Sequence, residues 1–215
     1  MSKSTTNTNS KGTALITGAS TGIGAIYADR LAKRGYNLIL VARNEERLKS
    51  LSERLASETG RSVQVLRADL NNKAELATVE STLRNDPSIT MLVNNAGIGS
   101  VAPLLEADID EMEDLIALNI TALTRLTYAA APSFVARGKG AIINISSVVG
   151  VAPERLNGVY GASKAYVIAL SHSLQHELAD QGVRIQAVLP GAVATDFWEI
   201  AGKPHQNLPP SIVGR

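Results

Sequence analysis

The stretch Thr17-Gly18-Ala19-Ser20-Thr21-Gly22-Ile23-Gly24 joins a short apolar run to a segment with helical spacing. The run before it, GTALIT at 12–17, is bounded by glycine and predicts a buried strand. After it, apolar residues recur at 23, 26, 27 and 31, the spacing of one helix face. Glycines at such a junction let the backbone turn tightly and let a pyrophosphate approach the helix N–H groups. The spacing G-x-x-x-G-x-G predicts a dinucleotide-binding loop, the alternative being a plain strand-to-helix turn.

The rest of the chain continues the alternation of strand and helix. Apolar runs at 36–42, 63–66, 89–93, 141–145 and 183–189 predict further strands. Helical segments separate them, including a long one from Asp108 through Ala131 and another over Val159–Leu178. Strands that alternate with helices form a parallel sheet that is covered on both faces. We therefore expect an α/β protein with a single doubly wound, Rossmann-type domain and helices on both faces of its parallel sheet.

Length, charge and composition narrow the classes of function. The 215 residues favour one domain. Lys and Arg number 21 against 20 Asp and Glu, a balance that predicts neither nucleic acid nor a membrane surface as a partner. The longest apolar run, Ala165–Leu170, has six residues, far fewer than the about 20 that span a bilayer. A chain without cysteine has no disulfide and no thiolate metal site, and we expect it in the cytoplasm.

Two smaller features complete this outline. His172 and His176 have helical i,i+4 spacing, but no third ligand stands beside them, so we expect a helix surface and no metal site. Residues 1–10 are polar and lack the apolar stretch of a signal peptide, which predicts a disordered leader before a single domain at 11–215.

The choice of nucleotide is read at Arg43. It lies nineteen residues after Gly24, at the end of the second predicted strand, where the ribose of the adenosine is recognised. An acidic residue there would bind the free 2′-hydroxyl of NAD, whereas the planar guanidinium of arginine suits a 2′-phosphate. Arg43 therefore predicts NADP (NADPH) in preference to NAD, the alternative being an ordinary surface arginine.

A second constellation consists of Ser147, Tyr160 and Lys164. Tyr160 and Lys164 stand four residues apart in a predicted helix and share one face, and Ser147 follows the predicted strand 141–145. A free tyrosine has a pKa of about 10, too high for proton transfer near neutrality. We expect Lys164 and an oxidised nicotinamide, both positive, to lower that pKa. The pattern thus predicts proton exchange between Tyr160 and a substrate oxygen that Ser147 holds.

Together these motifs resemble the short-chain dehydrogenase/reductase family from about Lys11 to Asp196. The matching motifs are TGASTGIG at 17–24, NNAG at 94–97, Asn119, Ser147, YGASK at 160–164 and PGAVATD at 190–196. The resemblance implies a catalytic tetrad of Asn119, Ser147, Tyr160 and Lys164. In it Tyr160 is the general acid/base and Ser147 steadies the carbonyl or alcohol. Lys164 binds the nicotinamide ribose and lowers the tyrosine pKa, and Asn119 holds a water of the proton relay.

The resemblance also implies a set of cofactor contacts. Asp69 and Leu70 would flank the adenine, Asn95 the adenosine side, and Val193 the carboxamide. The full expected set is Gly18, Ser20, Thr21, Gly22, Ile23, Gly24, Arg43, Asp69, Leu70, Asn95, Ala96, Gly97, Tyr160, Lys164, Pro190, Gly191, Val193 and Thr195. Thr21 stands where many NADP-using relatives carry a basic residue, so the NADP prediction depends on Arg43.

The end of the chain departs from the family pattern. Members usually continue beyond the PG motif with a substrate-covering segment, a helix and a final strand, and here 24 residues follow Gly191. We expect no strand after Pro190, with the final strand and helix missing and a homo-oligomer made doubtful.

The expected activity is NADPH-dependent reduction of a carbonyl compound, or the reverse oxidation, by hydride transfer. The complete tetrad favours this enzyme. The short C-terminus favours the alternative, a dinucleotide-binding sensor or truncated inactive form without turnover. The expected pocket residues are mostly apolar and indicate a hydrophobic small-molecule substrate. They are Ile98, Val149, 152–156, Phe197 and Trp198.

Overall fold

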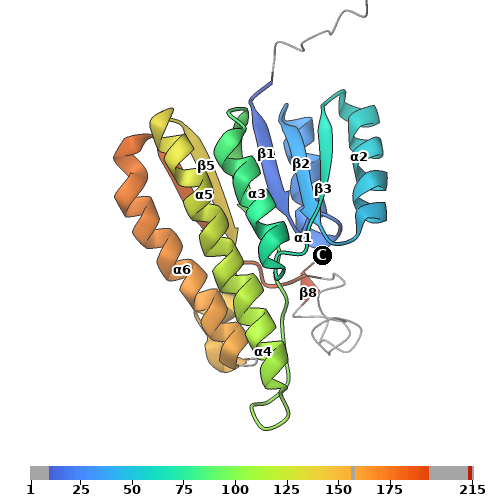
Figure 1. The fold of residues 1–215 in the computed structure, drawn as a ribbon. Coiled ribbons are helices and arrows are strands. Elements are labelled where there is room, and N and C mark those ends of the chain that lie inside the picture. The colour runs from blue at the N-terminus through green and yellow to red at the C-terminus, as the bar shows by residue number, and fades with distance from the viewer. Residues whose placement is uncertain (1–9, 156–157, 194–212, 215) are drawn as a thin grey trace, which may run out of the picture.

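The computed structural model describes residues 10–155, 158–193 and 213–214 (Figure 1). Its main sheet has six parallel strands in the order β3-β2-β1-β4-β5-β6. They are β1 (Thr13–Thr17), β2 (Asn37–Ala42), β3 (Val63–Arg67), β4 (Ile89–Asn94), β5 (Gly140–Ile145) and β6 (Val183–Val188). The strand order reverses between β1 and β4, which opens a crevice at the carboxyl edge where such sheets bind ligands. The prediction of a doubly wound parallel sheet is confirmed.

The helices form a layer on each face of this sheet (Figure 1). They are α1 (Gly22–Lys33), α2 (Glu45–Thr59), α3 (Lys73–Asn85), α4 (Ile109–Ile116), α5 (Leu123–Ala136) and α6 (Gly158–Leu178). One apolar cluster joins α1 and α2 to Ala14 and Ile16 of β1. A second joins α3, α5 and α6 to Leu15 of the same strand. Successive residues of β1 thus face opposite layers, which is why the whole strand is apolar and buried.

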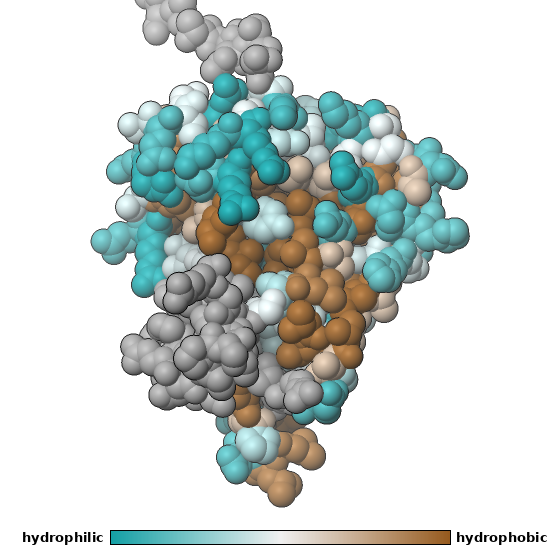
Figure 2. Space-filling model, turned by 180° about the vertical axis from the view of Figure 1, so that it is seen from behind, coloured by the Kyte–Doolittle hydropathy of each residue, from teal (hydrophilic) through white to brown (hydrophobic). Residues whose placement is uncertain are grey.

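The two layers do not extend equally far across the sheet. Within the described residues α1 and α2 contact β1, β2 and β3, and strand β6 has no helix of that layer against it. Accordingly β6 buries Val183 and Ile185 toward α5 and α6 while Arg184 and Gln186 are exposed. Figure 2 shows apolar surface in the middle of this face.

The expectation of a chain without strands after Pro190 is wrong in one detail. Ala192–Val193 forms the short strand β7, which pairs in parallel with β8 (Val213–Gly214) as a separate ribbon. Two-residue strands are too short to produce a recognisable alternation of apolar residues. The last strand and helix of the family pattern are not among the described residues. The predicted leader, apart from Ser10, also lies outside them.

The predicted helix from Asp108 through Ala131 is interrupted. The chain runs through α4, widens into a π-helical segment at Ala117–Ala122, and continues as α5 to Ala136, past Pro132. The π-helical segment has only six residues, too few for a different apolar period to show in the sequence. π-Helical turns are rare and often occur at functional sites, and this one contains Asn119.

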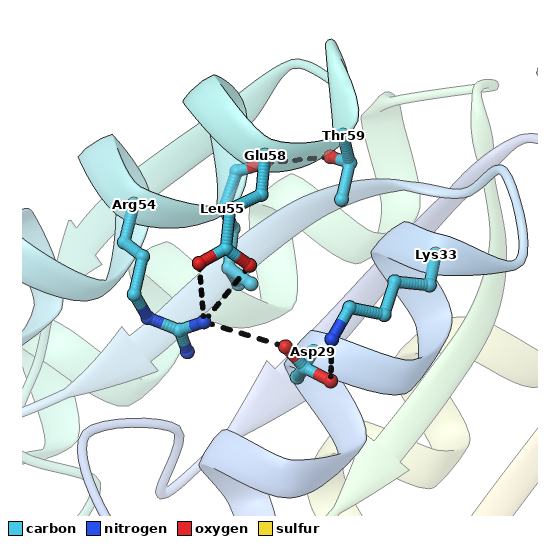
Figure 3. A network of polar contacts seen from close by, with 6 residues as sticks. All are labelled: Asp29, Lys33, Arg54, Leu55, Glu58 and Thr59. Carbon is cyan, nitrogen blue, oxygen red and sulfur yellow. Dashed lines mark hydrogen bonds and ion pairs between the residues drawn. The ribbon is translucent and has the colours of Figure 1, made fainter.

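Polar side chains connect α1 to α2 at the surface (Figure 3). Asp29 on α1 lies 2.9 Å from Lys33 Nζ and 3.4 Å from Arg54 Nη1 of α2. Arg54 also pairs with Glu58 at 3.1 Å. Because these groups remain partly exposed, we expect each pair to contribute at most about 1 kcal/mol to stability.

Candidate active site

The glycine loop is packed directly against the NNAG segment. Thr17 Oγ1 accepts hydrogen bonds from the backbone N–H groups of Asn95 and Ala96, both at 3.0 Å. The side-chain amide of Asn95 donates to the carbonyls of Thr17 and Gly18 at 3.0 and 3.1 Å. A Cβ on Gly24 would stand 2.3 Å from the Gly18 carbonyl oxygen. The predicted loop therefore depends on the close approach of backbone to backbone, and Asn95 supports the loop with its side chain.

The junction between β1 and α1 has the backbone shape and the N–H groups that a dinucleotide pyrophosphate needs. Gly18 and Gly22 have φ of 62° and 54°, conformations that favour glycine. Thr21 is the N-cap residue of α1, and its side chain makes no capping hydrogen bond. The first N–H groups of α1 are therefore left to a ligand, as in other helix N-termini that hold a pyrophosphate. Ser20, Thr21, Gly22 and Ile23 are half-buried at this junction.

Arg43 is exposed just beyond β2, beside Asn44, which caps α2 by accepting the N–H of Arg47 at 2.9 Å. Asn44, Arg47 and Ser20 line a hollow of about 500 Å³ between the glycine loop and α2. The sequence pattern identified Arg43 and Ser20 but did not suggest Arg47. Arg47 belongs to no recognised sequence motif, and it comes close to the glycine loop only in the folded structure.

The predicted adenine contacts differ in how they are held. Asp69 is half-buried; its carboxylate accepts the N–H of Asn71 at 3.0 Å, and its own N–H donates to Glu75 at 2.6 Å. That backbone hydrogen bond is the main reason why the pKa of Glu75 is lowered, and Arg67 adds to the effect. Leu70 packs into the core with 6% exposure, so its side chain faces the sheet interior.

Ser147, Tyr160 and Lys164 meet at the carboxyl edge of β5, as predicted. Ser147 follows β5, and a hydrogen bond links its side chain to Tyr160. Lys164 Nζ donates to the carbonyl of Ile145 at 3.1 Å and lies 5.8 Å from the centre of the Tyr160 ring. All three side chains are buried. This arrangement places one phenol, one hydroxyl and one amine around the same small volume.

The fourth residue, Asn119, binds the segment after β4. Its amide donates to the carbonyl of Ile98 at 2.9 Å and accepts the N–H of Ile98 at 3.0 Å. The same amide donates to Ser163 Oγ on α6 at 3.2 Å. A Cβ on Gly97 would stand 3.0 Å from Asn119 Oδ1 and 3.4 Å from Lys164 Nζ. The structure thus brings the four predicted tetrad positions together, with Gly97 between two of them.

The lowering of the tyrosine pKa is expected from Lys164 together with an oxidised nicotinamide, and the protein groups alone do not produce it. Burial raises the pKa of Tyr160 to about 12, and the Ser147 hydrogen bond opposes this only in part. Burial also lowers the pKa of Lys164 to about 8. The lysine amine is directed to the Ile145 carbonyl and does not offset the desolvation of the phenol. The protein alone therefore keeps Tyr160 protonated at neutral pH.

The PG motif and the predicted pocket lie partly in the described chain. The Pro190 carbonyl accepts the N–H of Val148 at 3.1 Å, which holds Pro190 and Gly191 beside the segment that carries Ser147. Val193 belongs to β7. Ile98 and Val149 pack with Leu115 and Tyr160 in one apolar cluster, and Leu115 was not expected there. Of the predicted pocket stretch 152–156, Pro153–Arg155 forms a 3₁₀ turn, and Leu156 lies outside the described residues, as do Thr195, Phe197 and Trp198.

Other candidate groups are accounted for briefly. His172 and His176 are exposed on α6. In the described part of the chain no group of three or more His, Asp or Glu side chains is placed to hold a metal ion. Within the same residues no helix is long and apolar enough to cross a membrane.

Comparison with known proteins identifies the family of this chain. The family described as short chain dehydrogenase matches residues 12–205. A short-chain dehydrogenase from Sphingobium yanoikuyae, solved in complex with NADPH, is 50% identical with a TM-score of 0.91; the match covers 94% of this chain and 79% of that one. The bulky-bulky ketone specific alcohol dehydrogenase from Comamonas testosteroni is 49% identical with a TM-score of 0.83, over 85% and 73% of the two chains. Human 17-beta-hydroxysteroid dehydrogenase type 3 is 39% identical, over 85% of this chain and 59% of its own length.

The chain belongs to the short-chain dehydrogenase/reductase family. It is accordingly an NAD(P)-dependent oxidoreductase that interconverts alcohol and carbonyl groups of a small molecule.

Proposed function

We propose that this protein reduces a bulky, apolar ketone with NADPH, by direct hydride transfer to the carbonyl carbon. The observation that carries the proposal is the buried group of Ser147, Tyr160 and Lys164 at the carboxyl edge of β5, next to the glycine loop. Nucleotide binding alone has no need of the paired hydroxyls of Ser147 and Tyr160, which is why turnover is favoured over a sensor.

Ser147 and Tyr160 have different roles in the reduction. The bound dinucleotide supplies the hydride. Ser147 donates a hydrogen bond to the carbonyl oxygen and Tyr160 gives it the proton, since that oxygen gains negative charge as the carbon is reduced. With its pKa raised to about 12, Tyr160 is protonated at neutral pH and ready to act as the acid. Alcohol oxidation needs the phenolate, so we expect that direction to be favoured at alkaline pH.

Apolar surroundings support a bulky substrate. Ile98, Val149 and Leu115 form an apolar wall around Tyr160, and Val148 and Val151 are exposed beside it. Val148, Val151 and the half-buried Ile98 therefore offer a substrate apolar area and no charge. The likeness to the Comamonas alcohol dehydrogenase, named for bulky-bulky ketones, points to the same substrate class.

A ketone panel tests the activity. We expect NADPH oxidation with ketones that carry two bulky apolar substituents, and lower kcat/KM with acetone or with a polar hydroxyketone. Oxidation of NADPH with none of the panel, by folded protein, would contradict the proposal. A preference for the small or polar ketones would contradict the substrate class alone.

The preference for NADPH rests on Arg43, and the Sphingobium complex with NADPH supports it. A guanidinium–phosphate contact contributes roughly 1.5–3 kcal/mol. At 1.4 kcal/mol per tenfold, Arg43→Ala should weaken NADPH binding by about 10- to 150-fold and leave NADH nearly unchanged. Arg43→Asp should invert the preference. Titration of both cofactors into the three proteins decides the question, since equal losses for both would make Arg43 merely structural.

Two broader statements remain part of this proposal. We place the protein in the cytoplasm, because it has no cysteine. We treat 11–215 as one catalytic domain. Light scattering of the purified chain measures its state of assembly.

A further inference from the structure

Ser163 lies at the point where α6 meets the π-helical segment, and no role has been assigned to it so far. Its side chain is fully buried. Its hydroxyl donates to the carbonyl of Tyr160 at 2.7 Å and accepts from Asn119 Nδ2 at 3.2 Å. A single hydroxyl therefore joins the backbone of one tetrad residue to the side chain of another.

The hydrogen bonds fix the orientation of the Asn119 amide. A side-chain amide has two N–H donors and one carbonyl acceptor. In Asn119 one N–H goes to the Ile98 carbonyl, the second to Ser163, and the oxygen accepts the N–H of Ile98. Removal of the Ser163 hydroxyl would leave a buried N–H without a partner. A buried N–H without a partner is unfavourable, so the position of the amide that the wild type adopts becomes less stable.

A movement of this amide would affect Gly97 and Lys164, which lie next to it. The Asn119 oxygen lies 3.0 Å from the position of a Cβ on Gly97, and Lys164 Nζ lies 3.4 Å from the same position. Asn119 therefore packs on the segment that passes beside the Lys164 amine. Any shift there changes the separation between the NNAG segment and the start of α6, where Tyr160 is placed.

We propose that Ser163 is a positioning residue that acts through Asn119 to keep the π-helical segment and the start of α6 in register around Tyr160. The inference rests on the proposed function, because positioning has meaning only for a site that turns over. Ser163 does not touch the substrate; it sets the place of residues that do.

The same helix offers a matched control. Ser171 is also buried, donates to a carbonyl of α6 (that of Val167, at 2.7 Å) and accepts from a buried amide, Asn144 Nδ2, at 3.0 Å. It lies two helical turns further along, where Asn144 leads to Asn94 inside the sheet. Ser163→Ala and Ser171→Ala thus remove the same kind of hydrogen bonds from the same helix, one pair beside the tetrad and one away from it.

The test compares kcat, the Kd of NADPH and thermal unfolding in these two variants. We expect similar losses of Tm in both, with a kcat that is about 10- to 100-fold lower only in Ser163→Ala, since small misplacements of reacting groups reduce rates by that order. NADPH should bind both variants as it binds the wild type. Equal kcat in the two variants would overturn the inference. If Ser163→Ala does not fold, Ser163→Cys, of similar size, takes its place in the same comparison.

A double variant tests whether Ser163 acts through Asn119. If it does, Asn119→Ala combined with Ser163→Ala should be no slower than Asn119→Ala alone, because the shared interaction is already lost. Fully additive losses would contradict action through Asn119. A wild type that binds NADPH but turns over no ketone would overturn the proposed function, and the inference with it. An active wild type, together with equal kcat values for Ser163→Ala and Ser171→Ala, would overturn the inference about Ser163 but not the proposed function.

Discussion

The glycine loop and the tetrad lie at the same edge of the sheet but are built by different means. In the loop, glycines allow backbone atoms to approach each other. Hydrogen bonds of Asn95 with Thr17 and Gly18 connect the ends of β4 and β1. In the tetrad, buried polar side chains are each oriented by hydrogen bonds to a carbonyl or to one another. The shape of the loop therefore depends on glycines at close backbone contacts, whereas turnover depends on the placement of a few polar side chains.

This contrast leads to separable effects of mutation. A change in the loop should reduce affinity for the cofactor whatever the substrate. A change at Ser147 or in the Tyr160 hydroxyl should reduce the rate while the cofactor still binds, whereas loss of Lys164, which is expected to hold the nicotinamide ribose, should reduce both. The following experiments apply that distinction to the two regions and to the surface beyond them.

The largest effect is expected for Tyr160→Phe. The ring still packs with Leu115 and Val149, but the hydroxyl that gives the proton is lost. We expect kcat to fall by at least about 10²–10⁴-fold, the usual contribution of general acid–base catalysis. The Kd of NADPH, measured by fluorescence titration, should stay near the wild-type value. A near-normal kcat would show that Tyr160 is not the proton donor.

Gly24→Ala should act on the other region. The new methyl group would stand 2.3 Å from the Gly18 carbonyl and 2.6 Å from the Asn95 amide, so the loop must shift. We expect a loss of stability of about 1–3 kcal/mol, typical of overpacking, and NADPH and NADH binding weakened alike. Gly158→Ala is the control, because nothing lies within 4 Å of its Cβ position. An unchanged Kd in Gly24→Ala would show that the loop does not need the close approach.

The buried Lys164 should make stability depend on pH. Burial lowers its pKa from 10.5 to about 8. The free energy of unfolding is therefore highest above pH 10.5, where the amine is neutral in both states, and this stability is lost as the pH falls through 8, where the buried amine takes up a proton. At about 1.36 kcal/mol per pH unit, the full change is on the order of 3 kcal/mol. Relative to Lys164→Met, the wild type should therefore gain Tm between pH 7 and 9.5. A difference in Tm that is constant over this range would contradict the burial of the charge.

The smallest effect is expected for Lys33→Ala on α1. Lys33 pairs with Asp29 at 2.9 Å, and its side chain is 57% exposed (Figure 3). Exposed i,i+4 pairs contribute about 0.5 kcal/mol or less, and salt screens them. We expect the midpoint of urea unfolding to change hardly at all, with kcat and KM unaltered. A loss above about 1 kcal/mol would mean that the α1–α2 contact is more than a surface pair.

Much of the fold and site was accessible from the sequence, because local patterns determine them. The run GTALIT followed by the glycine loop predicted β1 and α1, and the four-residue spacing of Tyr160 and Lys164 predicted their common face. Such features depend on residues close together in the chain. The resemblance to a family added Asn119, which stands alone in its segment.

What the sequence could not predict depends on contacts between distant segments. The raised pKa of Tyr160 results from burial, which no local pattern measures. Leu70 is itself a predicted adenine contact, yet its side chain enters the core. Ser163 lies inside a quoted motif, but its partner is 44 residues away in the chain. These are properties of the assembled tertiary structure.

The central claim is that hydride passes directly from NADPH to a ketone at this site. The most direct measurement uses NADPH with deuterium in place of the transferred hydrogen and a bulky apolar ketone, with mass spectrometry of the product alcohol. We expect one deuterium on the carbinol carbon of the alcohol made by the wild type, and far less of the same labelled alcohol from Tyr160→Phe in the same time. An alcohol without deuterium, or one labelled at that carbon only when the solvent is D₂O, would contradict the account.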